Sequence, residues 1–361
     1  AAVEAEVESL VPRADALGDP AEDGAWDDVL ASLDDVGERL GELFAYAHCL
    51  VSDDTNDRGG NKAVAWLSGL SSRWSRAWIH PEQVVSRADE STWRALISRP
   101  GLAAQLPRFE DLRARSHLLL PAGEQTLLTE LSEPAMGSWS RLYDRLSGRL
   151  RAQVGDESLS AGQAFNRLDN PDPEVREAAF RGLETAWSAE LDDCAEILGN
   201  ITRTRQAIAD RLEVAPIELP LADHRLSRET LDAMIGFCEG PCRPLMHRYL
   251  AAKARALGTE KLHFWDLRAP VGEGDERWPW GDAQDFIVEQ FGTFSGEMAD
   301  YAAQAFRARQ VESEDRPGKR QGAFCIPFRR ARESRVFMTW SDTTTNLITL
   351  AHELGHAWHN E

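Results

Sequence analysis

The sequence of 361 residues is long enough for two or three domains or for one large lobed fold. Its 42% hydrophobic residues suffice for a sizeable core. The 40 basic and 60 acidic side chains give a formal net charge of −20, which argues against nucleic acid or an anionic membrane as a partner. By these measures we expect an ordinary soluble protein.

The five cysteines are odd in number and scattered, so a disulfide framework is not expected and a reducing compartment fits best. No stretch approaches the roughly 18 uninterrupted apolar residues of a transmembrane helix, and the N-terminus has neither a basic region nor an apolar signal core. We therefore expect a cytoplasmic location. Because the sequence lacks an initiator methionine, processing or a fragment is indicated, and a removed leader stays open.

Helical spacing of apolar residues dominates the first half of the chain. One series runs from Trp26 to Leu50 and ends in a polar turn at residues 52–61. A second carries Trp74 and Trp78 on its apolar face, and the pattern restarts after Pro81 and after later prolines. These patterns predict helical hairpins packed as an antiparallel array.

Residues 155–166 are expected to form a small hairpin and to mark a domain boundary, which divides the chain into domains at 1–165 and 166–361. The longest helical pattern follows, over residues 172–201, with Asp172 as its cap. We predict one long helix with a buried stripe. Two further helices are expected on either side of a break at Gly240-Pro241, and helical spacing returns at residues 287–305.

Three segments near the C-terminal end do not show helical spacing. Residues 263–271 are interpreted as extended because proline ends them, and residues 312–320 as a charged surface loop. Residues 335–340 form the clearest strand candidate. Such a strand beside an active site can pair with an extended peptide, or it can be an ordinary buried strand, and both interpretations stay open.

The last segment contains the pattern His-Glu-x-x-His. Apolar residues from Leu347 to Trp358 recur at helical steps, and Ser341 or Asp342 can cap the helix. On a helix, His352 and His356 stand one turn apart and point the same way, so both imidazoles can bind one metal. Glu353 flanks that metal without having to bind it, which suits a general base. The competing interpretation is two surface histidines on an amphipathic helix.

Zinc is the metal that this ligand set favours, because two imidazoles and one carboxylate form a normal catalytic zinc site with a fourth position for water. Zinc lowers the pKa of that water and polarises a substrate carbonyl. Glu353 is expected to take the proton from the attacking water and to pass it to the leaving amine, so the pattern predicts peptide-bond hydrolysis.

His359 is not expected to be the third ligand. It shares the face of His352 and His356, but seven residues place it about 10.5 Å along the axis from His352. A place in the cleft wall fits better. The residues after His356 also depart from the metzincin pattern, which has a glycine where His359 stands.

Several motifs in the same order resemble oligoendopeptidase F and the wider thimet-type oligopeptidases. They are residues 352–359 (His-Glu-Leu-Gly-His-Ala-Trp-His), residues 318–324 (Gly-Lys-Arg-Gln-Gly-Ala-Phe), residues 338–342 (Met-Thr-Trp-Ser-Asp) and residues 265–271, which match that family's Tyr-Asp-Leu-Tyr-Ala-Pro segment. The resemblance is specific from about Phe264 onward, and the N-terminal helices match in character only.

The resemblance implies a mainly α, helical two-lobed zinc oligopeptidase fold with a small β element before the metal helix. It implies one Zn²⁺ held by His352 and His356, Glu353 as general base, and short peptides as substrates, with Gly322, Ala323, Trp340 and His359 along the substrate groove. Lys319 or Arg320 is a candidate for binding a substrate carboxylate, or else both are solvated loop charges. Residues 166–361 are then the N-terminal part of a catalytic domain.

The family's third zinc ligand is a glutamate on a helix some two dozen residues after the second histidine, and its histidine and tyrosine oxyanion stabilisers lie later still. The sequence given stops at Glu361, which a helix would direct about 140° away from His356. We therefore expect a portion of a longer enzyme that is inactive alone. The alternative is a catalytically incomplete peptide-binding or scaffold protein that keeps the helical channel.

Overall fold

The structure is a computed structural model that describes residues 2–20, 23–272, 277–320 and 322–360. Helices make up most of it, and two small sheets complete the secondary structure of the described part. No described helix combines the length and the apolar character that crossing a bilayer requires.

The chain divides into two compact units, each built from several segments. The first comprises Ala1–His48, Arg58–Leu142 and Glu196–Thr230. The second comprises Cys49–Asp57, Tyr143–Ala195 and Leu231–Glu361. The single domain boundary predicted between residues 165 and 166 stays a prediction. The two compact units are each assembled from segments that are separate in sequence, which is a different kind of division.

Helices are the regular secondary structure of the first unit, whose described residues form no strand. Its elements are α1 (Ala2–Asp15), most of α2 (Ala25–Asp53), α3 (Arg58–Arg87), α4 (Glu90–Ile97), α5 (Leu106–Ala114), α6 (Ala122–Ser132), the last four turns of α10 (Leu191–Leu212) and α11 (Glu218–Asp223). The indole of Trp74 donates to the Leu33 carbonyl at 2.8 Å, which joins α3 to α2. The predicted restart at Pro81 is wrong: α3 continues through this proline to Arg87.

In the second unit, α7 (Ser138–Arg149) leads into a hairpin of β1 (Arg151–Val154) and β2 (Glu157–Ser160), followed by α8 (Ala161–Asn166). The predicted hairpin therefore exists but begins four residues before position 155. The helix predicted over residues 172–201 is two helices, α9 (Pro173–Ala189) and α10, separated at Glu190. Leu198, predicted as buried, is 65% exposed.

The segment predicted as extended at residues 263–271 contains a 3-10 turn at Phe264–Asp266 instead. A buried ion pair anchors this turn to α9. Arg176 on α9 pairs with Asp266 at 2.8 Å, and both side chains are almost fully buried. Burial raises the pKa of Asp266, but hydrogen bonds from Arg176 and His263 outweigh it and keep the pKa below its usual range.

Helix α12 (Arg228–Phe237) continues through a π-helical turn at Cys238–Cys242 into α13 (Arg243–Ala256), so the predicted break at Gly240-Pro241 is wrong. Next come α14 (Trp280–Phe294) and α15 (Gly296–Arg307), separated at Ser295. A three-stranded sheet of β3 (Val311–Glu312), β4 (Phe324–Phe328) and β5 (Glu333–Phe337) precedes α16 (Thr344–His359).

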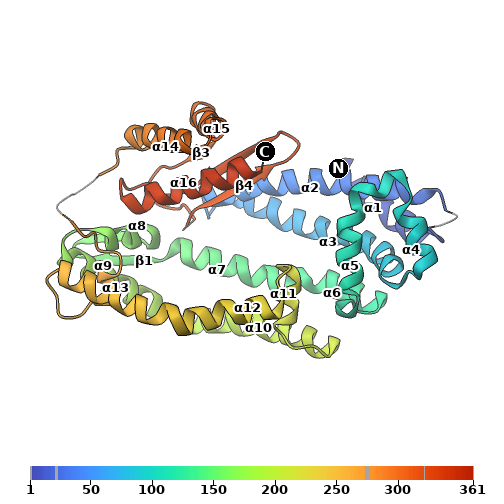
Figure 1. Cartoon of the computed structure of the whole chain (residues 1–361), viewed down its shortest axis with the longest axis horizontal. Coiled ribbons are helices and arrows are strands. Elements are labelled where there is room, and N and C mark those ends of the chain that lie inside the picture. The colour runs from blue at the N-terminus through green and yellow to red at the C-terminus, as the bar shows by residue number, and fades with distance from the viewer. Residues whose placement is uncertain (1, 21–22, 273–276, 321, 361) are drawn as a thin grey trace. The chain divides into compact units, whose positions relative to one another are not determined.

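The core beside α16 gathers apolar residues from α14, α15, β5 and α16, with Leu350 and Leu354 fully buried. Figure 1 shows α16 beside β4, and the two elements are in contact. A mainly helical fold with a small sheet before the last helix is therefore confirmed. That sheet supports the helix carrying His-Glu-x-x-His.

Candidate functional site

Helix α16 begins at a built cap. Thr343 is the cap residue, and its hydroxyl accepts from the Asn346 amide at 3.1 Å, so neither Ser341 nor Asp342 caps the helix as predicted. Asp342 instead adopts a left-handed conformation, with φ at 57°, that turns the chain from the sheet into the helix. The buried Asn346 fixes this turn because its side-chain oxygen accepts from both the amide and the hydroxyl of Ser341, each at 2.7 Å.

One face of α16 is buried and the opposite face carries the two histidines. The imidazoles of His352 and His356 are exposed, and their Nε2 atoms lie 3.0 Å apart. Two nitrogens bound at about 2.05 Å to a tetrahedral zinc ion stand about 3.3 Å apart. The two side chains therefore already have close to the separation that one shared cation requires.

Glu353 lies about 100° around the helix axis from His352 and about 60° from His356, and it is 8% exposed. Within the described ranges its carboxylate has no hydrogen bond and no ion pair. It lies close to Cys325 on β4: burial raises the pKa of that thiol, and the Glu353 carboxylate raises it further. Its oxygens are not among the fully buried polar atoms without a partner, so the carboxylate keeps some access to solvent although the residue as a whole is buried.

The described residues contain no group of three histidine, cysteine, aspartate or glutamate side chains that could hold a metal. His359 is exposed and ends α16, and its predicted place in the cleft wall stays a prediction. Glu361 lies outside the described residues. The two predicted ligands are thus close together, and the predicted third ligand is not among the described side chains.

Of the two interpretations left open for residues 335–340, the structure favours the buried strand, and β4 is the strand with an open edge. β5 is the central strand, with β3 on one side and β4 on the other. The Val336 amide donates to the Gln310 carbonyl, so Val336 faces away from β4. In an antiparallel ladder with this register, Cys325 and Pro327 direct their backbone groups to the outer edge of β4.

Trp340 lies in the core, 8% exposed, with its indole packed edge-on against Trp280 at 5.1 Å and donating to Asp342 at 2.8 Å. This structure gives the side chain a packing role, and the predicted substrate contact stays a prediction. Gly322 has φ at 101°, where glycine is favoured, and Ala323 leads directly into β4. Both therefore lie at the start of the open strand edge, where their predicted role also stays a prediction.

Lys319 is neither a solvated loop charge nor available to a substrate carboxylate. Its ammonium group is buried and donates to the Glu312 carboxylate at 3.0 Å, the Glu314 carbonyl at 2.7 Å and the Met338 carbonyl at 2.8 Å. All three donors are used. Burial is the largest influence on the pKa of Lys319 and lowers it below its usual value. The loop before β4 is thereby tied to the end of β5.

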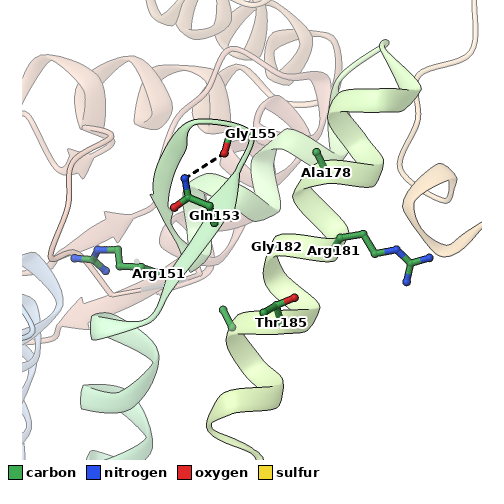
Figure 2. Close-up of a pocket in the computed structure, with 8 residues that line it drawn as sticks. Arg151, Gln153, Gly155, Ala178, Arg181, Gly182 and Thr185 are labelled. Carbon is green, nitrogen blue, oxygen red and sulfur yellow. Dashed lines mark hydrogen bonds between the residues drawn. The ribbon is translucent and has the colours of Figure 1, made fainter.

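A cavity of about 350 Å³ lies elsewhere, between β1 and α9 (Figure 2). A Cβ added at Gly182 would stand 2.3 Å from the Gln153 carbonyl oxygen, so this glycine lets the hairpin approach the helix. Figure 2 shows the Arg151 and Arg181 side chains directed away from each other. None of the lining residues belongs to α16 or β4, and the cavity is therefore separate from the histidine pair.

Comparison with known proteins agrees with the motifs. A family model described as Oligopeptidase F matches residues 85–151. Oligopeptidase PepF of Bacillus subtilis (strain 168) is 25% identical over 350 residues, which cover 92% of this chain and 51% of that protein. The chain is therefore similar to oligopeptidase F proteins over most of its length. Group B oligopeptidase PepB of Streptococcus agalactiae serotype III (strain NEM316) is 23% identical over 338 residues, covering 90% of this chain and 55% of that protein.

Solved structures share the fold. Oligoendopeptidase-F from Enterococcus faecium gives a TM-score of 0.65 at 21% identity, covering 85% of this chain and 60% of that chain. PZ peptidase A with inhibitor 2 gives a TM-score of 0.75 at 16% identity, covering 99% of this chain and 62% of that chain. The chain spans about half the length of the curated relatives that it matches.

Proposed function

We propose that this chain carries the metal-binding helix and part of the substrate groove of a zinc oligopeptidase that hydrolyses short peptides. The observation that carries the proposal is the 3.0 Å separation of the His352 and His356 Nε2 atoms on an exposed helix face, with Glu353 next to His352 in sequence. The names of the relatives support the reaction class.

The two imidazoles fit zinc by donor type and by separation. When bound, the ion supplies Lewis acidity toward the scissile carbonyl and lowers the pKa of water. His352 and His356 would hold it, and α16 keeps both side chains one turn apart because its buried face is packed against the core. A third ligand is expected from the part of the fold that the relatives have and this chain does not span.

Glu353 is the proposed general base. The residue is largely buried, its carboxylate oxygens keep some access to solvent, and no ion pair with a cation holds them in the described structure. Such a carboxylate can accept a proton from the attacking water and return it to the leaving amine. Cys325, the neighbour of Glu353 on β4, is half-buried, and this burial raises the pKa of its thiol.

The open edge of β4 is the proposed binding edge for the peptide. Cys325 offers both an amide donor and a carbonyl acceptor there, whereas Pro327 offers a carbonyl only. Backbone pairing of this kind gives affinity with little dependence on side chains, which suits an enzyme for mixed short peptides. Short peptides are thus the proposed partners, and a cytoplasmic location remains a prediction.

Zinc binding tests the metal site directly. Calorimetric titration of the 361-residue chain with zinc should give one site that H352A and H356A each weaken by at least tenfold. H359A is the matched control, because His359 shares the helix face but is too distant, and its affinity should be unchanged. Equal zinc affinity in all three variants would remove the histidine pair from the proposal.

Turnover tests Glu353. The chain extended to the full length of its relatives should cleave a quenched fluorescent peptide, and E353Q should lower kcat by at least about 100-fold because the base is lost. Zinc affinity should persist in E353Q, which separates loss of the base from loss of the metal. Unchanged turnover in E353Q would exclude the assigned role.

A second candidate is a catalytically incomplete peptide-binding protein. One observation favours it: within the described residues, the histidine pair is not joined by a third metal-binding side chain. Two imidazoles alone should hold zinc weakly. Peptide binding by the 361-residue chain without stoichiometric zinc would support this candidate, and tight zinc binding would argue against it.

A further inference from the structure

The tip of the β4–β5 hairpin is strongly basic in a chain with a net charge of −20. Residues 329–335 hold four arginines and a single acidic residue, Glu333. Arg329 and Arg332 are exposed at the turn, which the Arg332 amide closes by donating to the Arg329 carbonyl at 3.3 Å. Arg332 has φ at 50°, so its backbone is committed to the turn.

The acidic residue of the tip is already in use. Glu333 accepts from the Arg335 guanidinium at 2.7 Å and from the Gln310 side-chain amide at 3.3 Å. Arg335 is also packed over the Phe328 ring. Arg329 and Arg332 therefore remain without a carboxylate partner anywhere in the described ranges, although the chain carries an excess of acidic residues.

These two arginines lie directly beyond the end of β4. The backbone groups of Cys325 and Pro327 face the open edge, and Arg329 is the first residue after the strand, in the turn. A peptide paired with Cys325 can exchange two backbone hydrogen bonds, but at Pro327 the strand has no amide to donate. Backbone donors therefore end where the arginine donors begin.

We propose that Arg329 and Arg332 bind carboxylate groups of a peptide lying along the outer edge of β4, so that the site prefers acidic peptides. This inference rests on the groove assigned above. Four residues of strand span about 13 Å, so the carboxylate lies about four residues from the peptide residue paired with Cys325. Either acidic side chains or the C-terminal carboxylate of the peptide can supply it, and arginine suits both.

Binding measurements on the 361-residue chain test this without requiring turnover. The reference probe is a short peptide of uncharged residues with both ends blocked. Three relatives of it carry a pair of glutamates near the C-terminal end, a pair near the N-terminal end, or a free C-terminal carboxylate. Calorimetry should show at least one acidic peptide binding about threefold to tenfold tighter than the reference at low salt. The advantage should shrink at high salt.

The double variant R329Q/R332Q should abolish that advantage while leaving the affinity for the uncharged peptide unchanged. The matched control is R248Q/R255Q on α13, which removes two exposed arginines far along the chain from β4 and should keep the advantage. Comparison of the three charged peptides identifies whether side chains or the terminal carboxylate are recognised, and at which end.

Equal affinity for uncharged and acidic peptides, or an advantage that survives R329Q/R332Q, overturns the inference and leaves the hydrolase proposal intact. The absence of binding by every peptide also overturns it. A preference for acidic peptides in a chain that shows no turnover supports the arginine subsite while the catalytic proposal fails. The two proposals can therefore fail separately.

Discussion

The buried ammonium group of Lys319 provides the sharpest test of how the site is held together. Its three donors join the Glu312 carboxylate, the Glu314 carbonyl and the Met338 carbonyl, all within the second unit. Replacement by methionine keeps the aliphatic stem and removes the charge. The K319M variant therefore tests the hydrogen bonds separately from the packing.

The expected loss can be worked from these contacts. Two backbone carbonyls lose a charged donor in a buried setting, at roughly 1 to 2 kcal/mol each. Glu312 loses an ion pair but is partly exposed, so water recovers most of that interaction. Removal of a desolvated ammonium offsets part of the loss. We expect the free energy of unfolding to fall by about 3 kcal/mol.

Urea unfolding followed by tryptophan fluorescence measures this change, and the midpoint should fall by about 1 M. The control is K261M, because Lys261 is exposed and its replacement should alter the free energy of unfolding by less than about 0.5 kcal/mol. A loss below about 1 kcal/mol in K319M, or one equal to that of the control, would refute the reasoning. Since Lys319 ties the loop before β4 to β5, K319M should also weaken peptide binding.

Three further outcomes are expected. G182A should destabilise the protein by about 2 kcal/mol, because its Cβ would stand 2.3 Å from the Gln153 carbonyl oxygen; an unchanged melting temperature would contradict the close approach. N346A should lower the free energy of unfolding by about 1 to 2 kcal/mol, because the Ser341 amide loses its acceptor, and zinc affinity should fall if this turn positions α16. Urea unfolding measures the first change and zinc titration the second. Wild-type values in both would count against this role of Asn346. The pKa of Asp266 is lowered in the folded protein, so its ionised carboxylate stabilises the fold above the ordinary value of about 3.9, and this stabilisation is lost as the pH falls through the lower folded value. The free energy of unfolding should therefore drop less between pH 5 and pH 2 in D266N than in the unaltered chain. An equal drop would show that this carboxyl is not responsible.

Helix α16 was predictable from the sequence because the residues that determine it lie close together in the chain. The apolar spacing from Leu347 to Ala357 fixes the buried face, and one helical turn fixes the relation of His352 to His356. The structure shows both histidines on the exposed face, as that argument requires. The exact cap was missed, because three consecutive residues could each serve and only the Asn346 contact selects Thr343.

The predictions that failed concern features that depend on contacts between residues far apart in sequence. Pro81 was expected to end a helix, yet proline removes only one hydrogen bond and the buried face of α3 continues past it. The apolar residues at 172–201 were interpreted as one buried stripe, but a stripe does not reveal that Leu198 has no neighbour to cover it. Charge alone made Lys319 look like a surface residue, because sequence does not show that three oxygen acceptors surround it.

Local chemistry along the chain was enough to give the helix, its two imidazoles, their spacing and the carboxylate beside them, since each depends on residues within one or two turns. Folding in three dimensions assigned β5 to the centre of the sheet and β4 to its edge, buried Trp340 and Lys319, and left Arg329 and Arg332 without carboxylates. Strand order and burial depend on residues far apart in sequence, and a periodic pattern carries no information about which distant segment will lie beside it.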